Sequence, residues 1–560
     1  MAKLVKKEKK GLKSLRGSGT GSGVETSPLR PVFVEKRPPC GDTCPNSNLI
    51  RKWLTTIAQA EDLGKTTDQA LEEAFYIALE TTPFPSVCGR VCPHPCESEC
   101  NRKDKEGAVG INKIERVIGD YGLEHNLPPR RLTDGKRPEK IAVVGSGPAG
   151  MSCAYHLARH GYPVTVFEAF AKPGGMLRYG IPDYRLPPAI LDGEINRILG
   201  MGVALKLNTA VGSDVSLDDL RREYKAIFVG IGAHQGLKLQ LEGEDAPNVF
   251  TGTDFLHRVN AGESVEIGDR VVVIGGGDTA IDAARVARRL GAQATILYRR
   301  TRTEMPAIDE EVTGAEAEGV RIELLAAPIA IHRANGRAVG ITCQRMQLGE
   351  PDESGRRRPV PIPGDTFDVE CTALIAAISQ APDFDGFEDL REGRDWIKID
   401  DHGRTMKHDV FSGGDNTNLG LVVDAIAHGR MAAAAIHEMI SGEPMPKHPQ
   451  MAVIRPDRMK LSYYEESQRV AAPELPVGER LGHPEAEITG TLGREDAVHE
   501  AKRCMSCGYC FDCGSCWSYC QDNAVLKPVV KGQPYKFKME FCNGCKKCAE
   551  NCPCGYIEMH

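Results

Sequence analysis

The spacing of apolar and polar residues divides this chain into parts with different periodicities. Residues 45–80 place apolar side chains at every third or fourth position, as in IRKWLTTIAQAEDL and TTDQALEEAFYIAL, which is typical of amphipathic helices. From about Lys136 the pattern changes to short β-branched runs, each followed by a glycine turn and a helical stretch. From about Pro444 to Val498 the chain is Pro-rich and irregular. The pattern predicts a helical domain, an α/β middle, a linker and a separate C-terminal segment.

One strand–turn–helix–strand pattern occurs twice in the middle of the chain. The first copy is KIAVVGSGPAGMSCAYHLARHGYPVTVFEAF, and the second is RVVVIGGGDTAIDAARVARRLGAQATILYRR. Each copy has an apolar strand, a glycine-rich turn, a helix and a second strand, which together form a βαβ unit. The fold class expected is therefore α/β, with two Rossmann-like dinucleotide-binding domains flanked by a helical and an α+β domain.

The glycine turn of the first copy has the spacing that holds a dinucleotide. The glycines of G-x-G-x-x-G allow a tight turn, a close approach of the backbone to a pyrophosphate and close packing of the following helix. Glu168 ends the second strand, where a carboxylate can accept hydrogen bonds from ribose hydroxyls. The residues expected at this site are Gly145, Gly147, Pro148, Ala149, Gly150 and Glu168.

The second copy differs from the first at the end of the second strand, where a side chain can contact the ribose of the nucleotide. Aligning PVTVFE with ATILYR places Arg299 where the first copy has Glu168, and Arg300 follows it. A guanidinium can bind a 2′-phosphate but cannot accept a ribose hydroxyl, so we expect NADPH to be favoured over NADH; a solvated arginine pair is the alternative. The residues expected at this site are Gly275, Gly277, Asp278, Thr279, Ala280, Arg299 and Arg300.

The bulk composition is that of a globular protein of several domains. The 560 residues are 41% hydrophobic and 26% charged with a formal net charge of −7, which does not favour nucleic acid as a partner. No apolar run approaches the roughly 18 residues of a membrane span. The basic N-terminal stretch is not followed by the apolar segment of a signal peptide, so a cytoplasmic location is expected. Clustered cysteines in such a reducing compartment indicate metal ligands rather than disulfides.

The 20 cysteines are concentrated at the two ends of the chain. Cys153, Cys343 and Cys371 are the only ones between Cys100 and Cys504, and we expect them to be buried apolar side chains. Their wide separation excludes a catalytic dithiol beside a flavin. Electrons are therefore expected to leave the middle of the protein through metal clusters, and no catalytic acid or base is assigned.

The C-terminal cysteines have the spacing of a bacterial two-cluster ferredoxin. CNGCKKCAENCP gives C-x2-C-x2-C-x3-C-P, in which the fourth cysteine serves the other cluster. The same cysteine spacing occurs earlier in the chain, in a run that begins at Cys510. Cys504, Cys507 and Cys554 are left without a role. The ligands expected are Cys510, Cys513, Cys516 and Cys552 for one [4Fe–4S] cluster, and Cys520, Cys542, Cys545 and Cys548 for the other.

Several longer stretches resemble one family of flavoproteins. GGMLRYGIPDYRLP, YKAIFVGIGAHQG, MPAIDEEV, AAISQAPD and FSGGDNTNLGLVVDAIAHGRMAA are similar to the small subunit of glutamate synthase and the N-terminal part of dihydropyrimidine dehydrogenase. The resemblance covers roughly residues 35–440 and implies FAD in the first site and NADPH in the second, with the NADPH domain inserted in the FAD domain. It implies that FAD also contacts Gly174, Gly175, Met176, Ile181, Pro182, Arg185, Gly414, Asp415 and Val422, and that Gln380 lies near the interdomain hinge.

The same resemblance implies iron–sulfur ligands among the six N-terminal cysteines. The family's leading C-x2-C is missing here, and only its C-x3-C-P remains, as Cys40 and Cys44. Cys40 and Cys100 match ligands of a second cluster whose other two ligands are absent. A different partition of the six cysteines, a zinc site or a structural disulfide stays open. The ligands implied for one [4Fe–4S] cluster are Cys44, Cys92, Cys96 and Glu115.

The C-terminal ferredoxin-like segment narrows the resemblance further. RCMSCGYCFDCGSCWSYCQDNAV and ENCPCGYIEM are similar to the iron–sulfur flavoproteins of the dissimilatory sulfite reductase system. This implies an NAD(P)H:acceptor oxidoreductase that passes hydride between nicotinamide and FAD, then single electrons through clusters to or from that reductase. A glutamate synthase small subunit and a non-catalytic electron-wiring module are the alternatives. A homodimer or hetero-oligomer is expected.

The domain boundaries expected from these patterns divide the chain into seven segments. They are a basic disordered tail (1–35), a helical iron–sulfur domain (36–135), a first FAD-binding part (136–265), an NAD(P)H domain (266–384), a second FAD-binding part (385–444), a linker (445–500) and a ferredoxin domain (501–560).

Overall fold

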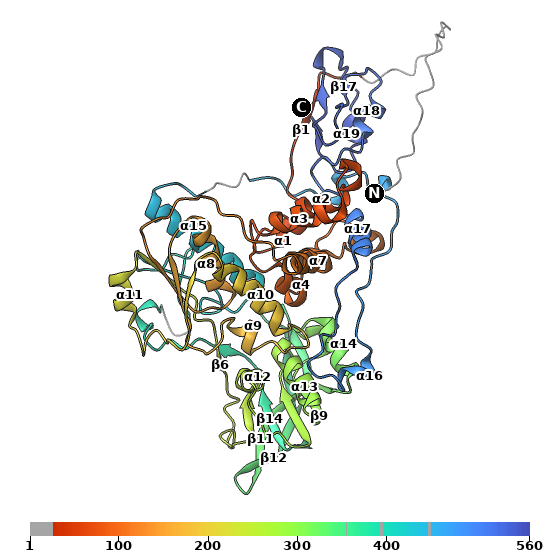
Figure 1. The fold of residues 1–560 in the computed structure, drawn as a ribbon. Coiled ribbons are helices and arrows are strands. Elements are labelled where there is room, and N and C mark those ends of the chain that lie inside the picture. The colour runs from red at the N-terminus through yellow and green to blue at the C-terminus, as the bar shows by residue number, and fades with distance from the viewer. Residues whose placement is uncertain (1–25, 354, 392–395, 446–449) are drawn as a thin grey trace.

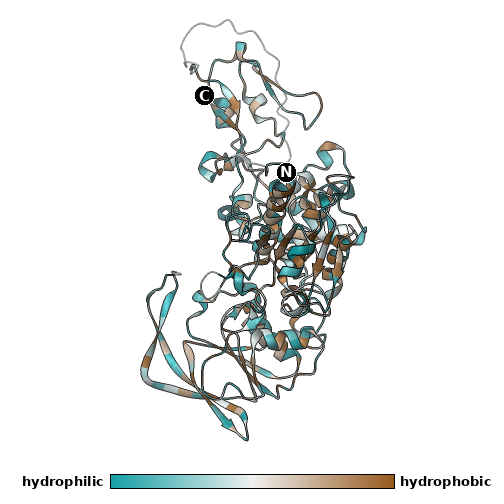
Figure 2. Cartoon of the chain, turned by 90° about the vertical axis from the view of Figure 1, so that its left-hand side faces the viewer, coloured by the Kyte–Doolittle hydropathy of each residue, from teal (hydrophilic) through white to brown (hydrophobic). Residues whose placement is uncertain are grey.

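The fold was obtained as a computed structural model that describes residues 26–353, 355–391, 396–445 and 450–560 (Figure 1). It contains a helical N-terminal domain, two parallel sheets and a small C-terminal domain, so the expected fold class is confirmed. Figure 2 shows that apolar residues concentrate in the strands and helices of the molecular interior. Among the described residues, no helix is both long and apolar enough to cross a membrane.

The N-terminal domain is a bundle of helices whose buried faces follow the predicted periodicity. In α2, the residues Ile50, Trp53, Leu54 and Ile57 point into the core. Helices α4 and α7 cross closely because Gly89 and Gly119 lack side chains at their contact, where a Cβ on Gly119 would lie 2.2 Å from a backbone nitrogen. The helices are α1 (Pro39–Thr43), α2 (Ile50–Ala58), α3 (Thr67–Ala78), α4 (Pro85–Val91), α5 (Pro95–Ser98), α6 (Lys103–Glu106) and α7 (Ile111–Glu124).

The first sheet has five parallel strands in the order β16-β5-β2-β3-β4. Its first βαβ unit is β2 (Ile141–Val144), α8 (Pro148–Arg159) and β3 (Val164–Phe167). Helix α15 packs on α8 so closely that a Cβ on Gly429 would lie 2.1 Å from the Ala149 carbonyl oxygen. The remaining elements of this domain are α9 (Met176–Tyr179), α10 (Pro188–Leu199), β4 (Ala204–Lys206), α11 (Leu217–Glu223), β5 (Ala226–Val229), β16 (Val410–Ser412) and α15 (Val422–Ser441).

The second sheet has the parallel order β10-β9-β8-β14-β7 and is joined to an antiparallel three-stranded sheet. The two parallel sheets are linked by a short antiparallel pair, β6 (Gln235–Gly236) and β15 (Gln380–Ala381). The other elements are β7 (Val249–Thr251), α12 (Gly252–Asn260), β8 (Arg270–Ile274), α13 (Asp278–Arg289), β9 (Gln293–Tyr298), α14 (Asp309–Ala317), β10 (Arg321–Leu324), β11 (Ala326–Ala334), β12 (Arg337–Pro351), β13 (Arg357–Glu370) and β14 (Ala373–Ala376).

The C-terminal domain lies at one end of the molecule (Figure 1), where its last strand pairs with β1. Helix α17 packs against α2 and α7, which places residues 494–502 on the N-terminal domain. The elements are α16 (Val477–Arg480), α17 (Arg494–Lys502), α18 (Ser515–Tyr519), β17 (Val525–Leu526), β18 (Lys536–Phe537), α19 (Lys547–Glu550) and β19 (Ile557–Met559).

Two of the expected boundaries differ from this topology. Residues 31–33 of the tail expected over residues 1–35 form strand β1 (Pro31–Phe33), which pairs antiparallel with β19; residues 1–25 lie outside the described part. The expected domain change at residue 266 is too late, because β7 pairs with β14 in the second sheet. Both differences arise from strand pairings between residues far apart in sequence, which local patterns do not specify.

Candidate functional site

The first glycine turn, between β2 and α8, is as tight as its spacing predicts. Gly145 has φ +91°, and a Cβ there would lie 2.2 Å from the Gly230 carbonyl oxygen of the neighbouring strand end. A Cβ on Gly150 would lie 2.0 Å from the Gly145 carbonyl oxygen. Gly147 faces Gly175, whose Cβ would lie 2.9 Å from the Gly147 Cα. Two bare backbone segments therefore face one another at the N-terminus of α8, where an anion is stabilised by the helix dipole.

A cavity of about 440 Å³ opens from this turn. Glu168 stands at its wall, where its carboxylate accepts hydrogen bonds from the backbone of Ser146 (3.0 Å) and Phe170 (2.8 Å). At another part of the wall, burial raises the pKa of Asp415 to about 6. The predicted residues that line the cavity are Gly145, Gly147, Pro148, Ala149, Glu168, Gly175, Met176, Gly414 and Asp415.

Other predicted FAD contacts lie outside the cavity lining, and some lining residues were not predicted. Gly150 packs beneath the turn, and Gly174, Ile181, Pro182, Arg185 and Val422 are also outside the lining. Phe170 and His234 line the cavity and pack edge to face, with ring centroids 5.4 Å apart. Burial, followed by nearby His257, lowers the pKa of His234 to about 4, so this imidazole is neutral at pH 7. A single phenylalanine and a single histidine form no sequence motif that could have identified them as lining residues.

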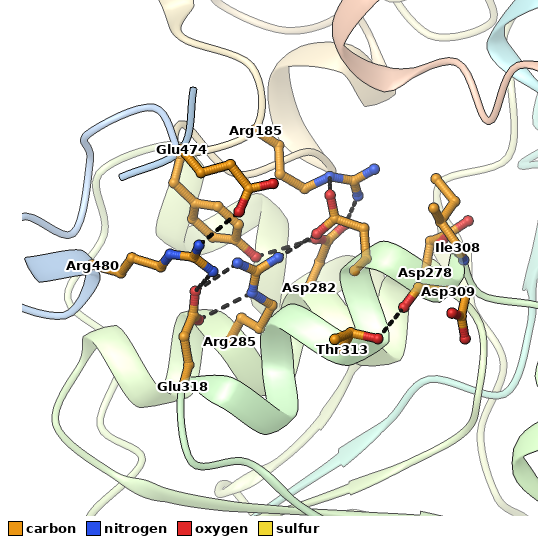
Figure 3. Close-up of polar contacts among 12 residues, drawn as sticks. Arg185, Asp278, Asp282, Arg285, Ile308, Asp309, Thr313, Glu318, Glu474 and Arg480 are labelled. Atoms are coloured by element: carbon orange, nitrogen blue, oxygen red, sulfur yellow. Dashed lines mark hydrogen bonds and ion pairs between the residues drawn. The ribbon is translucent and has the colours of Figure 1, made fainter. Parts of the chain in front are cut away.

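Arg185 joins the two dinucleotide-binding domains instead of reaching the cavity. Its guanidinium lies 2.6 Å from the Asp282 carboxylate on α13 and 3.2 Å from Glu311 (Figure 3). The preceding residue, Tyr184, is buried against α13, where its hydroxyl donates to Asp282 at 3.2 Å and Arg289 stacks 3.8 Å from its ring. The segment predicted to bind FAD therefore also fastens the FAD domain to the NAD(P)H domain.

The second glycine turn, between β8 and α13, repeats the geometry of the first. Gly275 has φ +146°, and a Cβ there would lie 2.1 Å from the Ala377 carbonyl oxygen. Ala280 is buried beneath the turn, and Gly277 directly precedes α13. Asp278 accepts a hydrogen bond from the Ile308 backbone at 2.9 Å, and Thr279 lies close to α12. The turn thus presents backbone N–H groups at a helix N-terminus, as a pyrophosphate requires.

The two arginines after β9 lie in different environments. Arg299 is exposed at the C-terminal end of the strand, at the position that corresponds to Glu168. Arg300 is buried and donates to the Asp352 carboxylate at 2.7 Å and to the Arg357 carbonyl oxygen at 2.8 Å. Because Arg300 is held by these partners, Arg299 is the residue of the pair that is free to reach a ligand.

Gln380 lies in the connection between the two parallel sheets. It belongs to β15 and pairs with Gly236 of β6. The first sheet lies on one side of this pair and the second sheet on the other (Figure 1). The role of Gln380 near an interdomain hinge stays a prediction.

The cysteines of the N-terminal domain gather around one carboxylate. Cys92, Cys96 and Cys44 each interact electrostatically with Glu115 of α7. Glu115 accepts from the Asn48 side chain at 3.3 Å, and burial, followed by nearby Glu194, raises its pKa to about 8. The structure therefore brings the four implied ligands together. It also places Cys88 beside Glu115, which sequence spacing did not single out.

The C-terminal cysteines form two groups that match the expected crossed ligand sets. Cys510, Cys513, Cys516 and Cys552 line one cavity of about 20 Å³. Cys548 interacts with Cys542, Cys545 and Cys520, the four cysteines expected for the other cluster. Cys554 lines the first cavity, and its thiol lies 3.8 Å from Cys552. Each group thus takes three cysteines from one C-x2-C-x2-C run and the fourth from the other run.

The donor chemistry and the shapes of these sites fit the groups that the family uses. A Cβ on Gly145 or Gly150 would collide with a backbone carbonyl oxygen, so the tight turn that offers its backbone N–H groups to a pyrophosphate requires glycine at these positions. The cysteine groups supply thiolates in ferredoxin spacing. Within the described residues, no group of three or more His, Cys, Asp or Glu side chains lies in the arrangement of a single-ion site.

Comparison with known proteins places this chain among characterised relatives. Residues 139–429 match the pyridine nucleotide-disulphide oxidoreductase family, and residues 33–127 match dihydropyrimidine dehydrogenase domain II, 4Fe-4S cluster. The chain is 37% identical over 525 residues to the NADPH-Fe(3+) oxidoreductase subunit beta of Geobacter sulfurreducens, covering 85% of this chain and 76% of that protein. It is 37% identical to the NADP(+)-dependent formate dehydrogenase subunit beta of Moorella thermoacetica (84% and 70% covered) and 36% identical to the glutamate synthase [NADPH] small chain of Escherichia coli (71% and 88% covered).

These matches and the two glycine turns define the class of the protein as an FAD-dependent NAD(P)H oxidoreductase with a 4Fe–4S domain. Within that class, the chain belongs to the pyridine nucleotide-disulphide oxidoreductase family, in the branch that contains the glutamate synthase small chain and the subunit beta relatives. The broad resemblance inferred from the sequence is therefore confirmed. The middle of this chain nevertheless lacks the paired cysteines of a disulfide reductase, because Cys153 is buried in α8, Cys343 in β12, and Cys371 between β13 and β14.

Proposed function

We propose that this protein is an NAD(P)H:acceptor oxidoreductase that connects nicotinamide, FAD and iron–sulfur clusters to a protein redox partner, and that the partner is dissimilatory sulfite reductase. The observation that carries the proposal is the order of the sites along one molecule. The two dinucleotide turns occupy the middle, and the cysteine groups lie in the N-terminal and C-terminal domains. Bound FAD would supply the exchange between a two-electron hydride and single electrons that such an order requires.

The residues of the first site bind and position rather than react. The turn from Gly145 to Gly150 would hold the FAD pyrophosphate at the N-terminus of α8. Glu168, already fixed by the backbone N–H groups of Ser146 and Phe170, would offer its remaining lone pairs to ribose hydroxyls. His234 keeps this part of the wall uncharged because it is neutral at pH 7.

The nicotinamide preference is proposed to depend on Arg299. Its exposed guanidinium is available for a 2′-phosphate, whereas Arg300 is held by Asp352. We expect anaerobic NADPH to bleach the flavin absorbance of the purified protein, with a kcat/KM for NADPH well above that for NADH. In Arg299→Glu, the NADPH value should fall by more than tenfold, because a carboxylate repels the 2′-phosphate, and the preference should shift toward NADH.

The matched control is Arg321→Glu, an exposed charge reversal on the neighbouring strand β10. It should leave both kinetic constants within about twofold. An unchanged NADPH/NADH preference in Arg299→Glu would contradict the assignment of Arg299. Absence of bleaching by either nucleotide in the flavin-loaded wild type would contradict the proposed enzymatic function itself.

We place the proposed partner site on the C-terminal domain, around Val529 and Val530. These two residues are adjacent in sequence, lie between β17 and β18, and are 102% and 65% exposed. Adjacent exposed apolar side chains are candidates for contact with another protein. The large apolar side chains that this domain exposes are Tyr509, Tyr519, Leu526, Val529, Val530, Met539 and Phe541.

Capture of purified partners tests this part of the proposal. Immobilised full-length protein should retain dissimilatory sulfite reductase, and the double variant Val529→Asp/Val530→Asp should weaken the affinity by at least tenfold because it places charges in the apolar surface. Leu132→Asp changes another exposed apolar residue, whose backbone N–H donates to Arg159 of the FAD domain, and this variant should bind normally. Retention of a glutamine-hydrolysing glutamate synthase subunit instead of sulfite reductase would favour the alternative function.

A further inference from the structure

Four cysteines without a role in the sites above meet in one cavity. Cys40 and Cys100 come from the N-terminal domain, and Cys504 and Cys507 come from the segment that follows α17. All four line a cavity of about 20 Å³ between α2 and the C-terminal segment. Cys40 interacts electrostatically with each of the other three. Residues more than 400 positions apart in sequence therefore assemble a complete set of four thiols.

This cavity closely resembles the one in the ferredoxin-like domain. The cavity lined by Cys510, Cys513, Cys516 and Cys552 also measures about 20 Å³. Both cavities are lined by cysteines, four here and five in the ferredoxin-like domain where Cys554 is the fifth, and by apolar side chains, here Leu54 and Ile111. In each case the ligand set combines a C-x2-C pair with cysteines from elsewhere in the chain. A site that is expected to hold a [4Fe–4S] cluster thus provides an internal standard for the new one.

The backbone around Cys504 and Cys507 has the same unusual conformation as the ferredoxin ligand loops. In the C-x2-C loops that end at Cys507, Cys513 and Cys545, the residues just before and just after the second cysteine are left-handed. This directs backbone N–H groups toward sulfur, and the Ser506 N–H lies 3.5 Å from the Cys504 Sγ. Serine rarely adopts such a conformation without a reason. The pairs are Ser506 and Gly508 (φ 47° and 74°), Asp512 and Gly514 (58° and 76°), and Gly544 and Lys546 (71° and 62°).

The surroundings supply the charge and the hydrogen bonds that an anionic cluster needs. Arg51 and Arg102 both line the cavity. The Arg51 guanidinium donates to the Cys507 carbonyl oxygen at 2.8 Å, and Arg102 donates to the Arg503 carbonyl oxygen at 2.6 Å. The Asn101 amide donates to the Cys507 Sγ at 3.6 Å. Cationic side chains and N–H···S bonds are the outer contacts that stabilise a thiolate-ligated cluster.

The segment that carries Cys504 and Cys507 is fixed firmly to the N-terminal domain. Glu500 of α17 is fully buried and accepts from the Gly110 backbone N–H at 2.6 Å. Arg503 is 1% exposed and donates to the carbonyl oxygens of Gly107 (2.7 Å) and Ala108 (3.0 Å). The juxtaposition of the four cysteines therefore belongs to a well-packed interface.

We propose that Cys40, Cys100, Cys504 and Cys507 hold a further [4Fe–4S] cluster at the junction of the two cysteine-rich domains. The C-terminal segment then supplies the C-x2-C pair that the N-terminal sequence lacks. The junction site adjoins both neighbouring groups. The N–H of Gly508, next to Cys507, donates to the Cys554 carbonyl oxygen of the ferredoxin-like domain at 2.7 Å, and Cys96 interacts electrostatically with Cys40. The assignment does not depend on the identity of the redox partner.

Elemental analysis of ligand variants tests this assignment. Full-length protein purified and reconstituted anaerobically should contain about sixteen iron atoms per chain if the four groups each hold a [4Fe–4S] cluster. Cys504→Ser/Cys507→Ser should lose about four iron and four sulfide, and Cys40→Ser/Cys100→Ser should lose the same amount. Combining all four substitutions should cause no further loss, because both pairs belong to one site. Cys510→Ser/Cys513→Ser should add its own loss to either pair.

The control and the contrary outcomes are measured by metal content and do not depend on enzymatic activity. Cys371→Ser replaces a buried cysteine of the NAD(P)H domain and should keep the full iron content. Additive losses from the two pairs would overturn the shared site, and zinc in place of iron would overturn the cluster. If the variants do not fold, about twelve iron atoms in the reconstituted wild type would overturn it as well. Flavin bleaching by NADPH tests the proposed function, so the two can fail independently.

Discussion

Gly145→Ala is expected to yield protein that purifies without bound flavin. The added Cβ would lie 2.2 Å from the Gly230 carbonyl oxygen, which belongs to the backbone and cannot rotate away. The turn would have to open, and its N–H groups would leave the positions that a pyrophosphate requires. Overpacking contributes about 1–3 kcal/mol to the loss of unfolding free energy, and the left-handed backbone adds about 1–2 kcal/mol. The flavin-to-protein absorbance ratio and chemical denaturation measure the two effects.

Gly291→Ala separates the steric effect from the conformational one. Gly291 follows α13 and has the same φ of +91°, but nothing lies within 4 Å of the position that its Cβ would take. It should lose only the left-handed penalty of about 1–2 kcal/mol and retain its flavin. Normal flavin content in Gly145→Ala, or equal flavin loss in both variants, would show that the turn does not act as a pyrophosphate cradle.

The tight turn at Gly145 belongs to the part of the site that can be predicted from sequence. The turn at Gly145 packs against Gly150 only five positions away, so its spacing alone identifies the βαβ unit. The crossed ligand sets of the ferredoxin-like domain are likewise predictable, because each run repeats one short pattern. Such features depend on residues that are neighbours in sequence.

Contacts between distant residues were not predicted. The resemblance implied that Arg185 contacts FAD, but the sequence did not indicate its ion pair with Asp282, which lies 97 positions later. Arg300 was expected to assist with a 2′-phosphate, and the sequence did not indicate its ion pair with Asp352, which lies between β12 and β13. The pairing of β1 with β19 joins residues more than 500 positions apart. No local pattern in one sequence reports such contacts.

The cysteines combine both situations. The sequence left the C-x2-C pair of Cys504 and Cys507 without a role, because its spacing does not indicate which other residues could complete a ligand set. The same is true of Cys40 and Cys100, which lacked two partners. Only the packing of α17 on α2 and α7 brings the two incomplete pairs together. Two unexplained fragments of sequence therefore account for one another once the fold is known.

Glu318→Gln is expected to cause the largest loss of stability that a single polar substitution produces where α13, α14 and α16 meet. The Glu318 side chain is fully buried at the end of α14 and binds Arg285 at 2.6 Å and Arg289 at 2.7 Å (Figure 3 shows Arg285 and Glu318). Arg480 of α16 approaches the same carboxylate at 4.0 Å. Replacing the carboxylate leaves three buried guanidinium groups without their shared counter-charge, which costs about 3–5 kcal/mol. Chemical denaturation at pH 7 measures this loss.

The pH dependence of the wild type provides a second measurement of the same residue. Burial alone would raise the pKa of Glu318, but hydrogen bonds from Arg285 and Arg289 lower it on balance. An acid whose pKa is lower in the folded state stabilises the protein above the unfolded-state pKa, and this contribution is lost as the pH falls through the folded-state value. The stability difference between wild type and Glu318→Gln should therefore be constant near neutral pH and shrink below about pH 4.

Glu316→Gln is the matched control, two residues earlier near the end of the same helix. Its carboxylate pairs with Arg302 at 3.2 Å, and the two side chains are 53% and 32% exposed. Such a surface pair contributes at most about 1 kcal/mol, because water solvates both charges when the pair is broken. Equal losses in the two variants would contradict the burial argument. A selective loss in Glu318→Gln would instead show that this carboxylate holds α13, α14 and the linker segment of Arg480 together, and with them the surface on which Tyr184 and Arg185 of the FAD domain rest.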